Sequence, residues 1–262
     1  MNDAKPRQTE WNAGSLAGCI DQTLLTATAT ESDAEAFCRE AAGFGFASVC
    51  LNPVFVPLAA SVLRDSAVRV CTVVDFPLGA GGFSAKEAQA KTCIRDGAEE
   101  LDFVVDLGLV KSRRWADLEN RLSALNEAVK TFSASLWAKE PARKSRAGLP
   151  SVITKLILET CWLSDEEITG CCRCAVTAGM DFVKTSTGFA VVKDAGGALL
   201  PNGATVRHVR LMREAVGSAA GVKASGGIRK LPDALAMLEA GATRIGTSSG
   251  VRILRELDTL ER

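Results

Sequence analysis

The sequence predicts a single (β/α)8 barrel, an α/β TIM barrel fold. Short runs rich in β-branched residues alternate with helical patterns, and eight such units follow one another along the chain. The length of 262 residues suits one such domain, because α/β barrels commonly take roughly 250 residues. The alternative is an open, doubly wound sheet. Against it, no Gly-x-Gly-x-x-Gly pattern follows the first predicted strand.

The predicted elements alternate in a regular order. The strands span residues 17–21, 48–51, 69–74, 100–105, 152–158, 182–185, 222–224 and 244–246. Helical patterns occur at 32–43, 84–97, 115–132, 164–179, 205–216 and 231–241. Ser32, Ser84 and Ser164 each have Glu three residues later, which is typical of a helix N-terminus. Glycines at positions 97, 179 and 241 are expected to cap the C-termini of three helices.

We expect one domain over residues 15–262, preceded by a flexible tail over residues 1–14. The longest spacing separates the fourth and fifth strands, and it contains a basic segment with Pro and Gly at 138–148. This segment is predicted to be a surface insertion, because exposed loops tolerate added residues. Binding of a partner is the alternative role for it.

The charge balance bears on partners and location. Lys and Arg number 31, as do Asp and Glu, so neither a nucleic acid nor an anionic membrane is an expected partner. No apolar run approaches the roughly 18 residues of a membrane span. The N-terminal segment is polar and lacks the apolar core of a signal peptide. A cytoplasmic location is therefore expected.

Nine cysteines are scattered through the predicted strands and helices. In a cytosolic chain we interpret them as reduced, mostly buried side chains. Cys171 and Cys174 form a Cys-x-x-Cys pattern, but Cys171 and Cys172 lie on the apolar face of a predicted helix. No second pair has the spacing of a zinc site, and His208 is the one histidine. Neither a metal nor a redox function is expected.

Two lysines stand at the ends of apolar runs, and a glycine turn follows each of them. Lys184 closes one run before Thr-Ser-Thr-Gly, and Lys223 closes another before Ala-Ser-Gly-Gly. Burying an ammonium group is costly unless it is paired or loses its proton. A neutral lysine is a nucleophile that can form a Schiff base with a carbonyl compound. The repeated pattern predicts one site built from two strands.

In such a barrel the site lies at the carboxyl ends of the strands. The polar side chains expected there are Asp21, Cys50, Asp102, Lys155, Glu159, Lys184 and Lys223. By period-two alternation, Asp102 shares a face with Asp106, and Lys155 shares one with Glu159. Three lysines are thus predicted to converge with carboxylates. The alternative is a purely structural cluster of ion pairs that fills the barrel.

Turns with glycine follow the seventh and eighth predicted strands. The first contains Gly226 and Gly227, and the second contains Ser248 and Ser249. In this fold the loops after these two strands often bind phosphate. Glycine lets backbone N–H groups approach the oxygens, and serine hydroxyls add donors. The alternative is that both are merely tight turns.

Several motifs resemble those of the deoxyribose-phosphate aldolases. They are DFVKTSTGF, VKASGGIR, GTSSG, IDQTLL, VCLNP, TVVDFPLG, GAEELD and KLILET, and they follow in order from about residue 19 to residue 254. The resemblance implies a class I aldolase on a (β/α)8 barrel. Such an enzyme cleaves 2-deoxy-D-ribose 5-phosphate to D-glyceraldehyde 3-phosphate and acetaldehyde, reversibly and through a lysine Schiff base. It implies no metal and no organic cofactor.

The same resemblance suggests roles for individual residues. Lys184 is the expected Schiff-base lysine, Lys223 the neighbouring cation, and Asp102 the acid/base group. The substrate-binding residues are expected to be Asp21, Cys50, Lys155, Thr187, Gly226, Gly227, Ser248 and Ser249. The implied partners are a small phosphosugar and acetaldehyde, with a homodimer as a possible assembly.

The chain departs from the family pattern at a few positions. Gln22 stands where many members have His, Asp75 where they have Gly or Asn, and Asp106 where Asn or another non-acidic residue is common. The chain contains no tyrosine, although some members use one near the C-terminus. Two alternatives for the function stay open. One is another Schiff-base barrel enzyme, such as a transaldolase or a sugar-phosphate aldolase, and the other is a non-catalytic barrel that binds phosphosugars.

Overall fold

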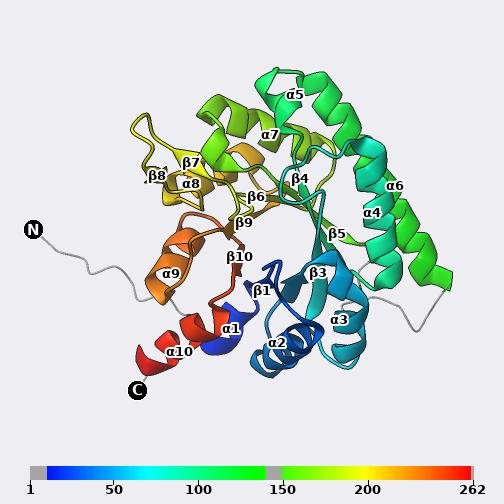
Figure 1. Ribbon diagram of the computed structural model, residues 1–262, viewed down its shortest axis with the longest axis vertical. Coiled ribbons are helices and arrows are strands. Elements are labelled where there is room, and N and C mark those ends of the chain that lie inside the picture. The colour runs from blue at the N-terminus through cyan, green and yellow to red at the C-terminus, as the bar shows by residue number, and fades with distance from the viewer. Residues whose placement is uncertain (1–10, 140–147, 149, 261–262) are drawn as a thin grey trace, which may run out of the picture.

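A closed barrel of eight parallel strands forms the centre of the molecule, and helices surround it (Figure 1). The structure, a computed structural model, describes residues 11–139, 148 and 150–260. Around the barrel the strands follow the order β1-β10-β9-β6-β5-β4-β3-β2. The (β/α)8 prediction is confirmed, and the open-sheet alternative is wrong, because β1 pairs with both β2 and β10.

The barrel strands are short. They are β1 (Ile20–Leu24), β2 (Ser48–Leu51), β3 (Arg69–Val74), β4 (Glu100–Val104), β5 (Ile153–Ile157), β6 (Phe182–Lys184), β9 (Gly221–Ser225) and β10 (Arg244–Thr247). Two further strands, β7 (Val192–Lys193) and β8 (Leu199–Leu200), form a small antiparallel hairpin between β6 and the next helix. The sequence analysis did not predict this hairpin.

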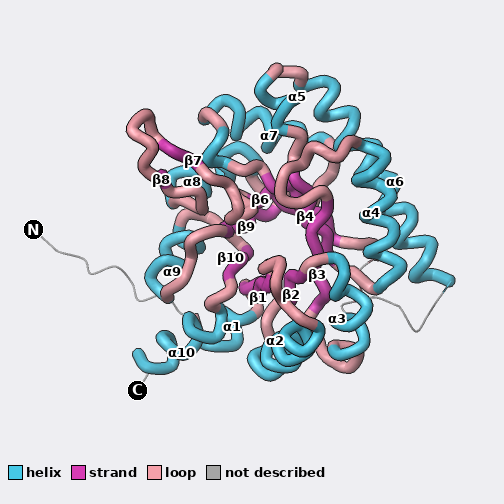
Figure 2. Tube along the Cα trace, in the orientation of Figure 1, coloured by secondary structure: helices cyan, strands magenta, loops and turns pink. Residues whose placement is uncertain are grey.

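The helices lie outside the barrel in a ring, as the cyan segments of Figure 2 show around the magenta strands. They are α1 (Ala13–Ala17), α2 (Glu31–Phe44), α3 (Val56–Val62), α4 (Phe83–Asp96), α5 (Leu107–Lys111), α6 (Trp115–Lys139), α7 (Asp165–Thr177), α8 (Val206–Val216), α9 (Leu231–Glu239) and α10 (Gly250–Leu260). Two 3-10 turns, η1 (Pro53–Phe55) and η3 (Thr160–Trp162), follow β2 and β5. Over the described residues, no helix combines the length and apolarity needed to cross a bilayer.

The start of the chain corrects one predicted boundary. The first strand was expected at 17–21, but β1 begins at Ile20, and residues before it form helix α1. The Asn12 side chain accepts a hydrogen bond from the Ser15 N–H, and the Ser15 hydroxyl interacts in return with the Asn12 backbone. This reciprocal cap favours a helix. Helix α1 therefore begins within the range expected as a tail, of which residues 1–10 lie outside the described residues.

Helix ends agree only in part with the predicted signals. Ser164 caps α7 as expected. Helix α2 is instead capped by Thr30, which exchanges hydrogen bonds with Asp33, so the N-cap lies two residues before the predicted Ser32. Helix α4 begins after Gly82 without a side-chain cap. The predicted glycine caps at 97, 179 and 241 all have positive φ, which confirms them. Of the segment predicted as an insertion at 138–148, residues 138–139 end α6, and residues 140–147 lie outside the described residues.

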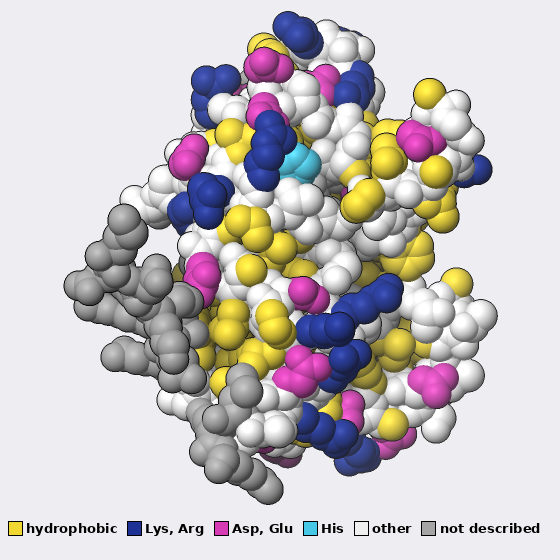
Figure 3. All heavy atoms as spheres, turned by 90° about the vertical axis from the view of Figure 1, so that its left-hand side faces the viewer, with side chains coloured by type: hydrophobic (Ala, Val, Ile, Leu, Met, Phe, Trp, Pro, Cys, Tyr) yellow, Lys and Arg dark blue, Asp and Glu magenta, His cyan; other side chains and the backbone are white. Residues whose placement is uncertain are grey.

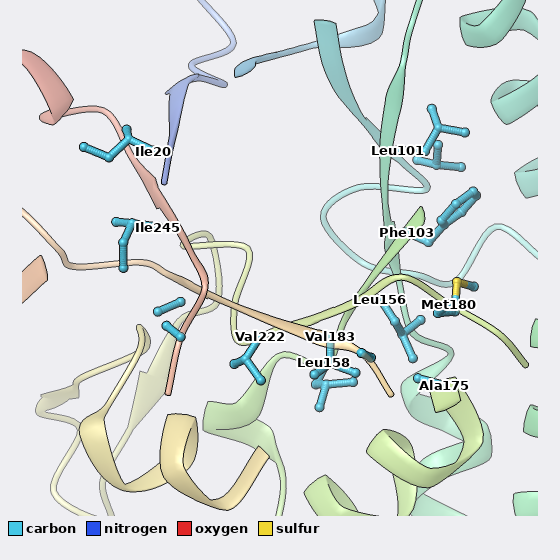
Figure 4. Packing of buried hydrophobic residues seen from close by; sticks show 14 of the residues in the cluster. Ile20, Leu101, Phe103, Leu156, Leu158, Ala175, Met180, Val183, Val222 and Ile245 are labelled. Atoms are coloured by element: carbon cyan, nitrogen blue, oxygen red, sulfur yellow. The ribbon is translucent and has the colours of Figure 1, made fainter. Parts of the chain in front are cut away.

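The two faces of the strands differ in chemistry. Leu101 and Phe103 of β4 pack in the large apolar cluster with residues of the helices, and Figure 4 shows them on the same side of the strand. Glu100 and Asp102 alternate with them and are fully buried in the barrel interior. Barrel interiors are usually filled by branched aliphatic side chains. Here charged side chains occupy part of the interior, which makes the interior a candidate location for a functional site.

The cysteines and surface charges agree with the sequence interpretation. All nine cysteines have free thiols, and seven of them are buried. Burial raises the pKa of the Cys172 thiol to about 12, so it stays protonated and unreactive.

On the face shown in Figure 3, Lys and Arg side chains are interspersed with Asp and Glu side chains. This mixture agrees with the balanced net charge.

Candidate active site

A cavity of about 540 Å³ opens at the carboxyl ends of the barrel strands. Four loops line it, those that follow β1, β6, β9 and β10. Lys184, the last residue of β6, contributes to its lining. The cavity thus lies where barrel enzymes place their active sites.

Asp102 is the centre of a buried hydrogen-bond network beneath this cavity. Its Oδ2 accepts from the ammonium groups of Lys184 and Lys223, each at 2.8 Å. Its Oδ1 accepts from Lys155 at 2.7 Å. The strand register explains the convergence, because Lys184 lies opposite Lys223 and Asp102 lies opposite Lys155. The three predicted lysines and the predicted aspartate do come together.

The charges around Asp102 determine its ionisation. Burial alone would raise the pKa of Asp102, but the positive charges of Lys155, Lys184 and Lys223 outweigh it and hold that pKa well below its ordinary value. The carboxyl group is therefore ionised at neutral pH. It can accept a proton from a substrate hydroxyl that reaches it.

A second layer of ion pairs lies deeper in the barrel. Asp21 pairs with Lys223 at 2.5 Å and with Arg244, and Glu100 pairs with Lys155 at 2.7 Å and with Arg244 at 3.3 Å. Neither Glu100 nor Arg244 was predicted from the sequence. Glu100 could have been found, since it stands two residues before Asp102 in the same strand and so shares its face.

Lys155 and Lys223 are held as cations. Burial would lower the pKa of Lys223, but Asp102 and Asp21 raise it above its ordinary value. Burial opposes the charge of Lys155 in the same way, and Asp102 outweighs it, so that the pKa of Lys155 is also raised. Lys184 differs from both in its position. Among the lysines of the described residues, it alone lines the cavity and hydrogen-bonds to Asp102.

The residues expected to bind substrate divide into two groups. Thr187, Gly226, Gly227 and Ser248 line the cavity as expected, and Ser249 lies next to Ser248 in an adjoining groove between α2 and α10. In contrast, Asp21, Cys50 and Lys155 are fully buried and do not line it. Asp21 and Lys155 contact Lys223 and Asp102 instead, so their geometry supports the charged side chains and not direct substrate contact.

Among the described residues, neither Glu159 nor Asp106 forms an ion pair with the three lysines, which corrects two expectations, although the charge of Lys184 acts to lower the pKa of Glu159. β5 ends at Ile157, and Glu159 adopts φ 56°, so period-two alternation no longer applies to it. Its carboxylate accepts hydrogen bonds from the N–H, at 3.2 Å, and the hydroxyl of Thr187. β4 ends at Val104, and Asp106 caps α5 by accepting from the Leu109 N–H at 3.1 Å. Burial raises the pKa of Glu159 despite its hydrogen bonds from Thr187.

The turn after β9 is tied to its neighbours. Gly226 and Gly227 have φ of 89° and 80°, a conformation that favours glycine. A Cβ on Gly203 would lie 2.2 Å from the Gly226 carbonyl oxygen, so these backbones pack closely. The Thr185 hydroxyl donates to the Ser225 carbonyl at 2.9 Å. The turn is therefore held in place before any substrate binds.

Two more side chains belong to this edge of the cavity. Gln22, one of the departures from the family pattern, is buried, and its Oε1 accepts from the Gly250 N–H at 3.0 Å. This contact holds the start of α10 beside Ser248 and Ser249. Arg229, two residues after Gly227, also lines the cavity and was not among the residues predicted to do so. Its guanidinium group adds a positive charge to the side of the cavity where the glycine turns lie.

Two groups of side chains have the proximity of metal ligands. In the described part of the chain, one group is Cys50, Cys71 and Asp102, and the other is Asp21, Cys71 and Glu100. Within each group the ligand atoms lie within 4.8 Å of one another. In both groups the carboxylates already pair with Lys155 or Lys223. Those ammonium charges repel a metal cation. The surroundings thus favour ion pairs between side chains over a resident metal.

The fold and the cavity define a class of protein. A parallel barrel with a lysine that lines a cavity, and with an ionised carboxylate hydrogen-bonded to its amine, is typical of enzymes that bind carbonyl compounds covalently. More specifically, the chain belongs to the DeoC/LacD family of aldolases, whose family model matches residues 16–257.

Curated relatives and solved structures agree with this family. The deoxyribose-phosphate aldolase of Carboxydothermus hydrogenoformans is 46% identical over 242 residues, which are 92% of this chain and 95% of the relative. Deoxyribose-phosphate aldolase 1 of Bacillus licheniformis is 45% identical over 242 residues, covering 92% and 96%. The tetrameric deoxyribose phosphate aldolase of Aeropyrum pernix superposes with a TM-score of 0.74 at 32% identity, covering 94% of this chain and 92% of that one.

Proposed function

We propose that this protein is a class I deoxyribose-phosphate aldolase. It cleaves 2-deoxy-D-ribose 5-phosphate reversibly to D-glyceraldehyde 3-phosphate and acetaldehyde. The observation that carries the proposal is the position of Lys184, whose amine lies 2.8 Å from the ionised Asp102 at the edge of the cavity. The names of the relatives support this choice of substrate.

The proposed reaction begins with covalent attachment. The Lys184 amine attacks the C1 aldehyde of the open-chain sugar, and loss of water gives a protonated imine. The Asp102 carboxylate accepts the proton of the C3 hydroxyl, directly or through a water molecule. The C2–C3 bond then breaks, and its electron pair moves toward the imine nitrogen to give an enamine. D-Glyceraldehyde 3-phosphate leaves with the C3 oxygen as its carbonyl.

The second half of the reaction regenerates the amine. C2 of the enamine takes up a proton, with Asp102 as the acid that now carries one. Water adds to the resulting imine, and acetaldehyde is released from Lys184. Lys223 stays protonated beside Asp102 and stabilises negative charge there. The lysine imine is itself the electron sink, so we propose that neither a metal nor an organic cofactor takes part.

A product assay with covalent trapping tests this function. The purified protein should convert 2-deoxyribose 5-phosphate to equal amounts of glyceraldehyde 3-phosphate and acetaldehyde. Borohydride added with acetaldehyde should leave one ethyl group on the protein, and peptide mapping should place it on Lys184. Transfer of a three-carbon ketose unit between sugars, without release of acetaldehyde, would instead identify a transaldolase.

Chelation should leave the activity intact. The ion pairs of the barrel surround Asp102 with ammonium groups, which disfavour a divalent cation. We therefore expect the initial rate after EDTA treatment and desalting to stay within about twofold of the untreated rate. Loss of activity that Zn²⁺ or Mg²⁺ restores would overturn the cofactor-free assignment.

Replacing Ser248 with Asp should weaken the binding of the phosphorylated substrate. Ser248 lies at the edge of the cavity beside the glycine turn, where we place the phosphate. A carboxylate there repels a phosphate dianion, so KM for 2-deoxyribose 5-phosphate should rise by about tenfold or more. KM for unphosphorylated 2-deoxyribose should change less, and equal losses on both substrates in a folded variant would argue against a phosphate site at this turn.

Two broader properties stay proposals. The balanced charge supports a cytoplasmic location. We propose a homodimer for the assembly, and sedimentation equilibrium distinguishes it from the tetramer described for the Aeropyrum pernix protein.

A further inference from the structure

The loop that follows β3 carries an ion pair outside the lysine network. Asp75 comes directly after β3, and Lys86 lies in the first turns of α4. The Lys86 ammonium lies 3.2 Å from Asp75 Oδ2, and the side chains of Lys86 and Asp75 are only 10% and 15% exposed. Lys86 also donates to the Gly79 carbonyl at 3.1 Å. The catalytic steps above use neither residue.

The same carboxylate organises the backbone of the loop. Both oxygens of Asp75 lie 3.0 Å from the Gly81 N–H, and the Asp75 N–H donates to the Gln89 side chain at 2.8 Å. Asp75 has φ 53°, a conformation that Asn, Asp and Gly tolerate better than other residues. A Cβ on Gly79 would lie 2.2 Å from the Val105 carbonyl oxygen, so the loop also presses against the end of β4. The loop therefore has one closely held conformation.

This loop supports one wall of the active-site cavity. Phe76, the residue after Asp75, packs on a small apolar cluster that consists of Leu25, Cys50, Cys71 and Val73. Its ring contacts the ring of Phe189 edge to face, with centroids 5.2 Å apart and planes at 82°. Phe189 lines the cavity together with Lys184 and is 48% exposed. Its N–H donates to the Thr187 hydroxyl at 3.0 Å, which ties it to the lysine motif.

We propose that Asp75 and Lys86 are positioning residues for the reaction. Their ion pair holds the 75–82 loop so that Phe76 supports Phe189, and Phe189 confines the aldehyde end of the substrate near Lys184. The glycine turns that we assign to the phosphate lie elsewhere on the cavity, after β9 and β10. Loosening the apolar wall should therefore impair turnover more than binding. This inference rests on the proposed aldolase function.

The test compares matched variants by steady-state kinetics. Asp75→Asn keeps an acceptor for the Gly81 N–H but removes the charge, and Lys86→Met removes the ammonium. Each should lower kcat for 2-deoxyribose 5-phosphate by about tenfold and change KM less than about threefold, because small misplacement of a substrate is costly to the chemical step. The double variant should be no worse than the more impaired single variant, since both remove one interaction.

A control variant separates positioning from general stability. Lys91→Met removes an ammonium from the same helix, where it pairs with Glu87 at 2.5 Å away from the loop. It should leave kcat within about twofold. In a Phe189→Ala background, Lys86→Met should have little further effect, because the wall that it supports is already gone. Equal kcat losses in Lys86→Met and Lys91→Met, or full additivity with Phe189→Ala, would overturn the proposal.

Amide hydrogen exchange measures local opening of this cavity wall independently of enzymatic activity. In Lys86→Met the amides of Phe76, of residues 78–82 and of residues 188–190 should exchange faster, and those of the barrel strands should not change. Unchanged exchange in these two segments would refute the structural part of the proposal. An active parent whose two variants keep full kcat would refute the positioning role alone. A parent that does not cleave 2-deoxyribose 5-phosphate would overturn the aldolase function, and with it the role of this ion pair in the reaction.

Discussion

Replacing Lys184 with Ala should lower kcat for 2-deoxyribose 5-phosphate by about four orders of magnitude or more. Loss of the covalent nucleophile removes the imine, and comparable losses accompany removal of nucleophiles in other covalent enzymes. A factor of 10⁴ corresponds to about 5.5 kcal/mol of transition-state stabilisation. Lys184→Arg should be equally inactive, because arginine cannot act as a neutral amine. Initial rates and borohydride trapping with acetaldehyde measure both effects.

The structure predicts that these variants still fold. Asp102 keeps Lys155 at 2.7 Å and Lys223 at 2.8 Å after Lys184 is removed, so its buried charge stays compensated. Unfolding curves in denaturant and the circular dichroism spectrum should therefore resemble those of the parent. A folded Lys184 variant that keeps near-parental cleavage would show that another residue is the nucleophile.

Replacing Lys223 with Leu should lower kcat by about two to three orders of magnitude and shift the pH profile. Lys223 and Lys184 donate to the same oxygen of Asp102. Removal of the Lys223 charge takes one cation from beside the Lys184 amine and leaves Asp102 with two ammonium partners. A positive charge beside an amine favours the neutral form of that amine, and removing this charge favours the protonated form. The acidic limb of the kcat/KM profile should therefore move to higher pH.

Lys155→Leu is the matched control for this variant. It too removes a fully buried ammonium group from Asp102, but from Oδ1 and not from the oxygen that Lys184 uses. Both variants should lose stability, by about 3–5 kcal/mol, since each removes an ammonium group from two buried carboxylates, Asp102 and either Asp21 or Glu100, whereas Lys184 pairs with Asp102 alone. The shift of the pH profile should be larger for Lys223→Leu. Equal shifts would show that the network responds to total charge and not to the shared oxygen.

Trapping distinguishes the roles of the two lysines. Borohydride with acetaldehyde should label Lys184 in the parent and, more slowly, in Lys223→Leu. If the label in the parent maps to Lys223, and the Lys223→Leu variant traps nothing, the nucleophile and its neighbouring cation are reversed.

The pattern of the sequence was sufficient for the fold and for the centre of the site. Eight strand and helix units predicted the barrel, and the position of Lys184, Lys223 and Asp102 near strand ends predicted that they meet. These predictions succeed because the carboxyl ends of all parallel strands meet at one edge of the barrel. The faces of Asp102 and Lys155 also followed from period-two alternation within their strands.

The depth of each side chain could not be predicted in this way. Asp21 and Cys50 stand near the ends of their predicted strands and Lys155 in the middle of its strand, yet all three lie buried away from the cavity lining. Strands in a barrel are tilted and staggered, so the layer that a residue occupies depends on its register with both neighbours. For Glu159, a left-handed backbone after the strand end redirected the carboxylate to Thr187.

Local patterns in the sequence thus determined the order of the elements, the faces of most strand residues and the choice of candidate reactive side chains. The tertiary structure alone decided which charges pair. Arg244 joins Asp21 and Glu100 across 223 and 144 positions of the chain, and the rings of Phe76 and Phe189 meet across two separate loops. The physical reason is that periodicity reports only the environment of neighbouring residues, whereas closure of the barrel brings together groups whose separation in the sequence carries no signal.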